Sequence, residues 1–231
     1  MSDKHALIVG ASRGIGLGLT ERFLERGWSV TATQRVGSGG NLAHAADRVG
    51  DRLRLEHVDI NDTAQVSALR ERLDGARFDL VLVNAGITHD RWETVAEVST
   101  ATFERLMLTN ALSPMRFVEQ FRDLVTPHGV LAVTSSGQGS ITNNTRVTGW
   151  EIYRASKSAL NQLMRSFAAR HADDPRTLLL LAPGWVRTEM GGPDAGLSVE
   201  ASTSGLADVV ETFSGRSGLH YVDHRGATVP W

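Results

Sequence analysis

The chain has no cysteine among its 231 residues, which excludes disulfide frameworks, thiolate zinc sites and cysteine nucleophiles. It has no excess of one charge either, because 24 Lys and Arg residues stand against 26 Asp and Glu residues. Without a basic run, the sequence offers no footprint for nucleic acid or for a membrane surface. No apolar run approaches the roughly 18 residues that a membrane-spanning helix requires. The N-terminal residues also lack the segments of a secretion signal, so we expect a soluble, cytoplasmic protein.

The remaining composition is typical of one folded domain. Apolar residues make up 41% of the chain and charged residues 22%, which excludes disordered, collagenous and coiled-coil proteins. Short apolar runs alternate with amphipathic stretches, and several runs are almost continuously apolar, as in parallel strands covered on both faces. These runs are 6–9, 28–32, 53–58, 80–83, 130–133, 178–182 and 219–222. We therefore expect a single α/β domain over residues 1–231, with a doubly wound, mostly parallel sheet of seven strands flanked by helices.

A glycine-rich segment directly follows the first predicted strand and leads into an amphipathic stretch. It consists of Gly10, Ala11, Ser12, Arg13, Gly14, Ile15 and Gly16. Glycines permit a tight turn and let the backbone approach a pyrophosphate at a helix N-terminus, where free N–H groups and the helix dipole favour anions. Such a turn also occurs without any ligand, and the absence of a following Gly-Lys-Ser/Thr excludes a Walker A loop. The loop therefore needs support from other motifs.

Four further motifs follow at the ends of later predicted strands or at the start of a helix. They are Asn84-Ala85-Gly86, Ser135-Ser136, Tyr153-x-x-x-Lys157, and Pro183-Gly184 with Val186 and Thr188 close behind. Together with the glycine loop, they resemble the motifs of the short-chain dehydrogenase/reductase family over essentially the whole chain. Within that family, the chain is most similar to the C-factor and sniffer-type carbonyl reductases. The similarity rests on the GSITNN stretch before Trp150, on the APGWVRT segment and on the terminal Val229-Pro230-Trp231.

The resemblance implies a Rossmann-type domain with a substrate loop at about 184–204. It also implies an NADPH-dependent oxidoreductase that transfers a hydride between nicotinamide and a carbonyl or alcohol, as in the reduction of a ketone, aldehyde or diketone. The partner would be this small molecule, and the protein a homodimer or homotetramer. One alternative is a nucleotide-binding, C-factor-like signalling or sensor protein with little turnover. An epimerase or dehydratase of the extended branch ranks last, because the region after Pro183 leaves little room for a sugar-nucleotide domain.

The resemblance implies that residues of four of these motifs, together with Arg35, Asp59 and Ile60, bind the cofactor. They are Gly10, Ser12, Arg13, Gly14, Ile15, Gly16, Arg35, Asp59, Ile60, Asn84, Ala85, Gly86, Tyr153, Lys157, Pro183, Gly184, Val186 and Thr188. Asp59 and Ile60 match the positions at the adenine, and Thr188 matches a position near the nicotinamide carboxamide. Asp59 is equally placed to cap the helix that follows, and both roles can hold.

The end of the second predicted strand distinguishes the two nicotinamide cofactors. An acidic residue there would bind the ribose hydroxyls and repel a 2′-phosphate, but this strand ends TATQR. Arg13 and Arg35 would instead clamp the phosphate, because the guanidinium fork suits phosphate oxygens. The alternative is a pair of solvated surface arginines. We therefore expect NADPH, with NADH the weaker candidate.

Tyr153 and Lys157 lie four residues apart, on one face of a predicted helix. An ammonium near a phenol favours the phenolate, so we expect Lys157 to lower the pKa of Tyr153 toward the working pH. In the family that the chain resembles, the matching tyrosine gives its proton to the carbonyl oxygen and the lysine also holds the nicotinamide ribose. The resemblance thus makes both residues catalytic.

Ser136 and Asn110 complete the implied catalytic set. Ser136 matches the family serine that orients the substrate carbonyl; Ser135 is its rival, and Gly139 three residues later favours Ser136. Asn110 matches the asparagine that holds a water in the family's proton relay. Its alternative is a helix-interior asparagine bonded to the backbone.

Trp150, Trp185 and Met190 lie beside these motifs and are interpreted equally well as an apolar wall for substrate or as loop packing. His220 and His224 are four residues apart, but in a strand and turn pattern without a third ligand, so we expect no metal site.

Two helical stretches carry further expectations. Pro114 should kink or break a helix expected over 102–124. An apolar stripe follows Lys157 and is interpreted as core or as a subunit interface; it consists of Ala159, Leu160, Leu163, Met164 and Phe167.

Overall fold

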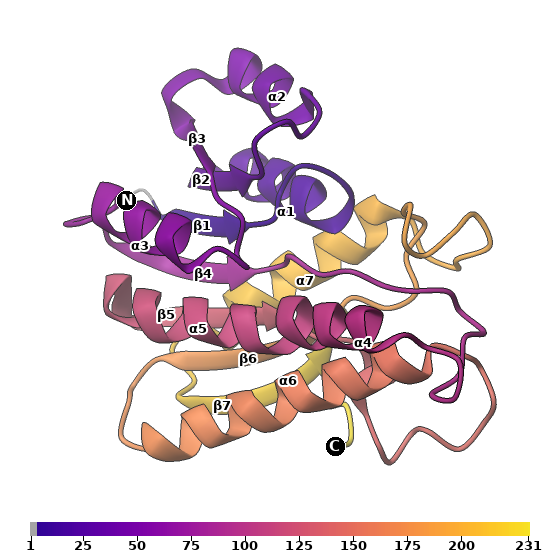
Figure 1. Ribbon diagram of the computed structural model, residues 1–231. Helices are drawn as coiled ribbons and strands as arrows, with labels where there is room; N and C mark the ends of the chain where they lie inside the picture. The colour runs from indigo at the N-terminus through magenta and orange to yellow at the C-terminus, as the bar shows by residue number, and fades with distance from the viewer. Residues whose placement is uncertain (1–3) are drawn as a thin grey trace.

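Seven strands form a sheet across the centre of the molecule, in the order β3-β2-β1-β4-β5-β6-β7 (Figure 1). The computed structural model describes residues 4–231. The strands are β1 (His5–Val9), β2 (Ser29–Gln34), β3 (Leu53–His57), β4 (Phe78–Val83), β5 (Val125–Thr134), β6 (Thr177–Ala182) and β7 (Gly218–Asp223). Every neighbouring pair is parallel. The predicted doubly wound sheet of seven strands is therefore confirmed.

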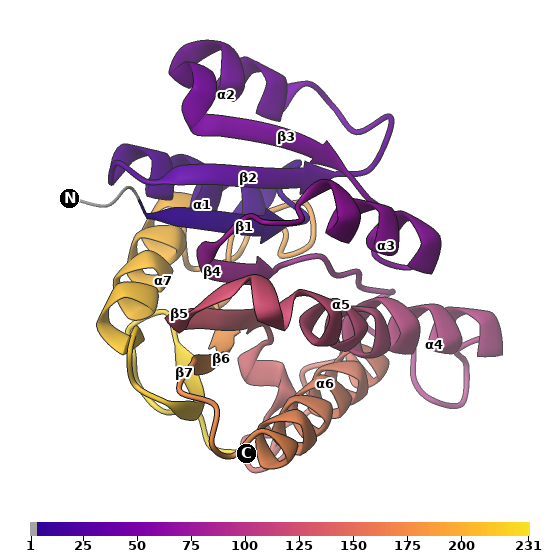
Figure 2. The same cartoon turned by 90° about the vertical axis from the view of Figure 1, so that its left-hand side faces the viewer.

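Helices cover both faces of this sheet (Figure 2). They are α1 (Gly14–Glu25), α2 (Asn41–Val49), α3 (Thr63–Arg72), α4 (Thr100–Met107), α5 (Ser113–Phe121), α6 (Glu151–Arg170) and α7 (Val199–Phe213). Successive strand side chains point to opposite faces. Leu7 accordingly joins a core with α3, α5 and α6, whereas Ile8 joins a second core with α1, α2 and α7. Burial on both faces explains why the strands are almost continuously apolar.

The helix expected over 102–124 is interrupted, as Pro114 predicted, but the interruption precedes the proline. α4 ends at Met107, a π-helical turn spans Leu108–Leu112, and α5 follows with Pro114 in its first turn. Proline is tolerated there because the first amides of a helix have no partner within it. Among residues 4–231, no helix is both long and apolar enough to cross a membrane.

The predicted motifs meet at one edge of the sheet. β1, β4, β5 and β6 are parallel, so their carboxyl ends share an edge, and each is followed directly by one of the motifs. Gly10 follows β1, Asn84 follows β4, Ser135 follows β5 and Pro183 follows β6. In open α/β sheets, ligands bind in the crevice outside these carboxyl ends.

Candidate active site

The glycine loop is packed too closely to accept side chains. A Cβ atom at Gly10, where φ is +84°, would lie 2.8 Å from backbone atoms of Ala85, and one at Gly16 would lie 2.2 Å from the Gly10 carbonyl oxygen. α1 begins at Gly14, the Arg13 side chain makes no capping hydrogen bond, and the first turn holds no acidic residue. The first amides of α1 are therefore available to an anion such as a pyrophosphate.

Asn84 connects this loop to the centre of the sheet. Its Nδ2 donates to the Gly10 carbonyl oxygen at 3.1 Å, and its Oδ1 accepts from Thr134 Oγ1 at 3.0 Å. Two residues on, a Cβ atom at Gly86 would lie 3.3 Å from Asn110 Oδ1 and 3.7 Å from Lys157 Nζ. The Asn84-Ala85-Gly86 motif thus lies between the glycine loop and the predicted catalytic residues.

Tyr153 and Lys157 lie together in the first turns of α6. Lys157 is 3% exposed, and its Nζ donates to the Thr134 carbonyl oxygen at 2.8 Å. The Nζ atom is 5.8 Å from the centroid of the Tyr153 ring. Burial lowers the pKa of Lys157 to about 8 and raises the pKa of Tyr153 to about 12, although a hydrogen bond with Ser136 opposes the latter shift.

The expectation that Lys157 lowers the pKa of Tyr153 is therefore wrong in this structure. Removing water from the phenolate raises the pKa more than neighbouring groups lower it. The lysine ammonium is also desolvated and bonded to a carbonyl oxygen rather than to the phenol.

The structure separates the two candidate serines. Ser135 is 1% exposed, and its Oγ donates to Asn161 Oδ1 at 2.6 Å. Ser136 is half-buried, and its Oγ accepts from the Gln138 amide at 3.1 Å and contacts the Tyr153 hydroxyl. Ser136 is thus the serine that lies at Tyr153, while Ser135 is occupied inside the fold.

Asn110 lies in the π-helical turn and is fully buried. Its Oδ1 accepts from the Ile87 amide at 2.8 Å, and its Nδ2 donates to the Ile87 carbonyl oxygen at 2.9 Å and to Ser156 Oγ at 3.0 Å. The side chain therefore fixes Ile87, as the alternative of an asparagine bonded to the backbone describes. Its role with a catalytic water stays a prediction.

Arg13 and Arg35, the predicted phosphate clamp, are both exposed. Arg13 forms an ion pair with Glu189, in which the two side chains are 67% and 72% exposed. Exposed pairs contribute at most about 1 kcal/mol, so this one leaves Arg13 free to bind a phosphate. The clamp stays a prediction.

Asp59 is not the cap of α3. The cap is Asp62, whose Oδ1 accepts from the amides of Ala64 and Gln65 at 3.0 and 3.1 Å. α3 begins at Thr63, four residues after Asp59, so Asp59 is too far from the first turn. Asp59 instead accepts from the Asn61 amide, and the predicted adenine contact of Asp59 and the buried Ile60 stays open.

The segment after β6 returns to the glycine loop. Gly184 has φ +84°, and a Cβ atom there would lie 2.5 Å from Leu197, while the buried Val186 forms a β-bridge to the same residue. A Cβ atom at Gly14 would lie 3.4 Å from Thr188 Cγ2, which places Thr188 against the start of α1.

The segment at about 184–204, predicted as a substrate loop, is not irregular throughout. Ser198 caps α7 by accepting from the Ala201 amide, so residues 199–204 are helical. A serine followed by Glu200 in the first turn is a helix-start signal.

One of the three predicted wall residues lies beside Tyr153. Trp150 is the only non-glycine residue in 4–231 with a positive φ, +65°, and its ring centroid is 6.3 Å from that of Tyr153 and 6.2 Å from that of His89. Trp185 is half-exposed and donates from Nε1 to the Gly191 carbonyl oxygen, so it fits loop packing. Sequence reasoning missed His89; its position three residues after Gly86 is the signal that could have found it.

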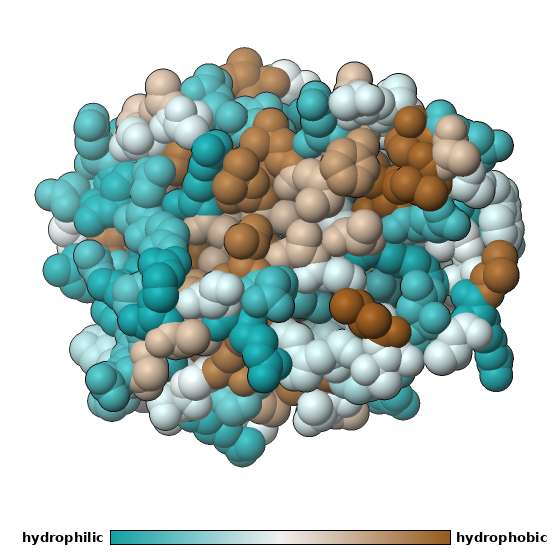
Figure 3. Space-filling model, turned by 60° about the horizontal axis from the view of Figure 1, so that its bottom comes forward, coloured by the Kyte–Doolittle hydropathy of each residue, from teal (hydrophilic) through white to brown (hydrophobic). Residues whose placement is uncertain are grey.

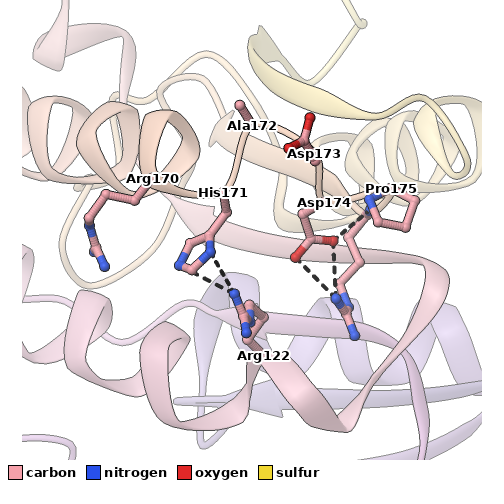
Figure 4. Close-up of a pocket in the computed structure, with 8 residues that line it drawn as sticks. Arg122, Arg170, His171, Ala172, Asp173, Asp174 and Pro175 are labelled. Carbon is pink, nitrogen blue, oxygen red and sulfur yellow. Dashed lines mark hydrogen bonds and ion pairs between the residues drawn. The ribbon is translucent and has the colours of Figure 1, made fainter.

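Two cavities are lined by residues other than Ser136, Tyr153 and Lys157. One, of about 610 Å³, lies under residues 144–149 and against Ala155 and Ser158 of α6, and Tyr153 does not line it. The other, of about 360 Å³, lies at the far end of α6 (Figure 4). There Arg176 pairs with Asp174 at 3.0 Å, and Arg122 contacts His171 at 2.6 Å. At 1.5 Å per helical residue this cavity is about 25 Å from Tyr153.

His220 lies in β7 and His224 just after it, so the helical spacing that would suit a metal is not realised. In residues 4–231, no group of three His, Cys, Asp or Glu side chains could hold a metal ion.

Comparisons with known proteins agree with this arrangement. Residues 4–195 match the short chain dehydrogenase family. The C-signal protein of Myxococcus xanthus is 33% identical over 155 residues, which cover 66% of this chain and 92% of that protein. A short-chain dehydrogenase/reductase from Burkholderia multivorans with bound NADP is 51% identical, with a TM-score of 0.97 over 99% of this chain and 100% of that one. A carbonyl reductase from Pseudomonas aeruginosa PAO1 in complex with NADP is 43% identical, with a TM-score of 0.91 over the whole of both chains. The chain belongs to the short-chain dehydrogenase/reductase family, as its motifs predicted.

Proposed function

We propose that this chain reduces ketones, aldehydes or diketones with NADPH. As a member of its family, it is an oxidoreductase that uses a nicotinamide cofactor. The observation that carries the proposal is the group of Ser136, Tyr153 and Lys157 at the carboxyl edge of the sheet, beside an uncapped glycine loop. Solved structures similar to this chain include an NADP-bound relative and an NADP-bound carbonyl reductase, which supports the choice of cofactor and of reaction.

The residues present fit a bound dinucleotide. Cβ atoms at Gly10 and Gly16 would meet backbone atoms, so these positions of the loop accept no side chain. Free backbone amides lie where the loop enters α1 and can bind the pyrophosphate. Arg13 and Arg35 are exposed and unshielded by an acidic residue at the end of β2, which supports NADPH over NADH. A bound NADPH would supply the hydride.

Tyr153 would act as the acid. Because its pKa is about 12, the phenol carries its proton at neutral pH and can give it to the oxygen of a carbonyl under reduction. Ser136 Oγ accepts from the Gln138 amide and contacts Tyr153, and its one proton would turn to the same carbonyl oxygen once a substrate is bound. Below pH 8 Lys157 stays mainly an ammonium beside the Tyr153 ring, where it would hold the nicotinamide ribose.

The test measures NADPH and NADH oxidation by absorbance against a panel of aldehydes, ketones and diketones. We expect NADPH to be consumed with some of them, and Tyr153→Phe to lower kcat by at least about 100-fold while still binding NADPH. A variant as active as the wild type would refute the role of Tyr153. Binding of both cofactors without reduction of any carbonyl would refute the reductase.

That second outcome would favour the signalling or sensor alternative, which has the similarity to C-signal in its support. The group formed by Ser136, Tyr153 and Lys157 argues for turnover, because a protein that only binds nucleotide does not require it.

We also propose that the chain forms a homodimer or homotetramer and works in the cytoplasm. Of the apolar stripe on α6, Leu160, Met164 and Phe167 are core, but Leu163 is 40% exposed. Apolar groups gather on the surface of this side of the molecule (Figure 3). An exposed apolar surface of this kind supports association between copies.

A further inference from the structure

His89 is half-buried, and its imidazole has no partner. Both ring nitrogens are covered, and neither forms a hydrogen bond within residues 4–231. A neutral imidazole always presents one donor and one acceptor. Buried polar groups without a partner are rare in folded proteins, so this one requires an explanation.

The chain on both sides of His89 is anchored at the candidate active site. Asn110 holds Ile87 through both its amide and its carbonyl oxygen, which anchors the chain two residues before His89. Two residues after it, the Arg91 carbonyl oxygen accepts from the Trp150 amide at 2.6 Å. The imidazole is thus held between two anchors, one on Asn110 and one at the start of α6.

The same anchors place His89 near the reacting atoms. Its ring meets the indole of Trp150 edge to face at 6.2 Å, and that indole meets the ring of Tyr153 at 6.3 Å. Trp150 is therefore a shared wall for Tyr153 and the unpaired imidazole. A substrate whose carbonyl reaches Tyr153 would extend along this wall toward His89.

We infer that His89 determines substrate specificity by bonding a second oxygen of the substrate, a hydroxyl or another carbonyl a few bonds from the one reduced. The inference rests on the proposed reductase function and names its substrate class. A donor and an acceptor on one ring match either oxygen group. A simple ketone would leave the imidazole unpaired, and a site that leaves buried polar groups unpaired discriminates strongly.

The test compares a matched pair of substrates, 1-phenylpropan-1-one and 1-phenylpropane-1,2-dione, which differ in the second oxygen. His89→Phe keeps an aromatic edge against Trp150 but removes the nitrogens. We expect kcat/KM for the dione to fall by about tenfold or more and that for the ketone to stay within about threefold. His89→Gln keeps a donor and an acceptor and should recover most of the activity on the dione.

His128→Phe is the matched control, because His128 is exposed at the other edge of the sheet and should leave both substrates unchanged. Equal losses for both substrates in His89→Phe, or no loss for either, would overturn the inference and leave the reductase intact. Reduction of other carbonyls of the panel, with no turnover of the dione by the wild type, would also overturn the inference alone. No turnover of any carbonyl of the panel would overturn the proposed function and this inference with it.

Discussion

Tyr153 and Lys157 show that burial, more than the charge of a neighbour, sets protonation at this site. Burial raises the pKa of the phenol and lowers that of the ammonium, so both shifts favour the neutral form. The sequence spacing predicted that the residues share a helix face, and they do. It could not predict the pKa values, because these depend on how much water the folded chain removes from each group.

The buried lysine predicts a stability that depends on pH. Below pH 8 Lys157 is protonated in both the folded and the unfolded chain, so the free energy of unfolding is lowered by the full cost of burying the ammonium. Between about pH 8 and pH 10 the folded chain loses this proton while the unfolded chain keeps it, so the free energy of unfolding rises, by at most about 3 kcal/mol. Above pH 10 the rise reverses, because Tyr153 ionises near pH 10 when unfolded and near pH 12 when folded.

Urea unfolding from pH 7 to pH 11 checks this prediction. Lys157→Met should remove the rise between pH 8 and pH 10. Lys4 is the only other lysine of the chain and is exposed, so Lys4→Met is the control and should keep the rise. The same pH profile in wild type and Lys157→Met would contradict the assignment.

At the scale of elements, short sequence patterns predicted the features that depend on residues close together in the chain. Apolar runs located the seven strands, and the motifs at their ends located one edge of the sheet, because parallel strands share their carboxyl edge. Asp59 was predicted to contact the adenine and to be equally placed as the cap of α3, but Asp62 makes the capping bonds. The left-handed backbone conformation of Trp150 and the unpaired imidazole of His89 could not be predicted, because contacts between residues distant in sequence create both.

The glycine loop yields the prediction at this scale. Gly16→Ala would place a Cβ atom 2.2 Å from the Gly10 carbonyl oxygen and 2.8 Å from Asn84 Nδ2. The loop must shift away from Asn84, so we expect NADPH affinity to fall by about tenfold or more and the midpoint of thermal unfolding to drop. Gly39→Ala is the control, since a Cβ atom there meets nothing within 4 Å. Fluorescence titration with NADPH measures the effect, and equal affinities of the two variants would refute the proposed binding of the cofactor by the glycine loop.

At the scale of the whole molecule, the last residues support the active site from behind. Tyr221 in β7 donates from its hydroxyl to the Ser136 carbonyl oxygen at 2.5 Å, and the ring of Trp231 lies 5.4 Å from the Tyr221 ring. The Trp231 carbonyl oxygen accepts from the Thr142 amide at 2.9 Å, in the segment between Ser136 and α6. The terminal motif that suggested the carbonyl reductase branch thus connects β7, the loop over the site and the catalytic serine.

This connection predicts that Trp231→Ala both destabilises the fold and slows the reaction. Trp231 is 38% exposed and also lies under Arg165, 4.6 Å from its ring. Replacing a fully buried tryptophan by alanine costs about 3–5 kcal/mol, so loss of this partly buried ring should cost about 1–2 kcal/mol in urea unfolding. Trp92→Ala is the matched control, because Trp92 is 60% exposed beneath Arg91 and should cost less than about 1 kcal/mol. With Tyr221 released, the Ser136 backbone loses its support, so kcat should fall several-fold while NADPH affinity is unchanged. A Trp231→Ala enzyme with wild-type kcat would show that Tyr221 holds Ser136 without help from the terminal residue.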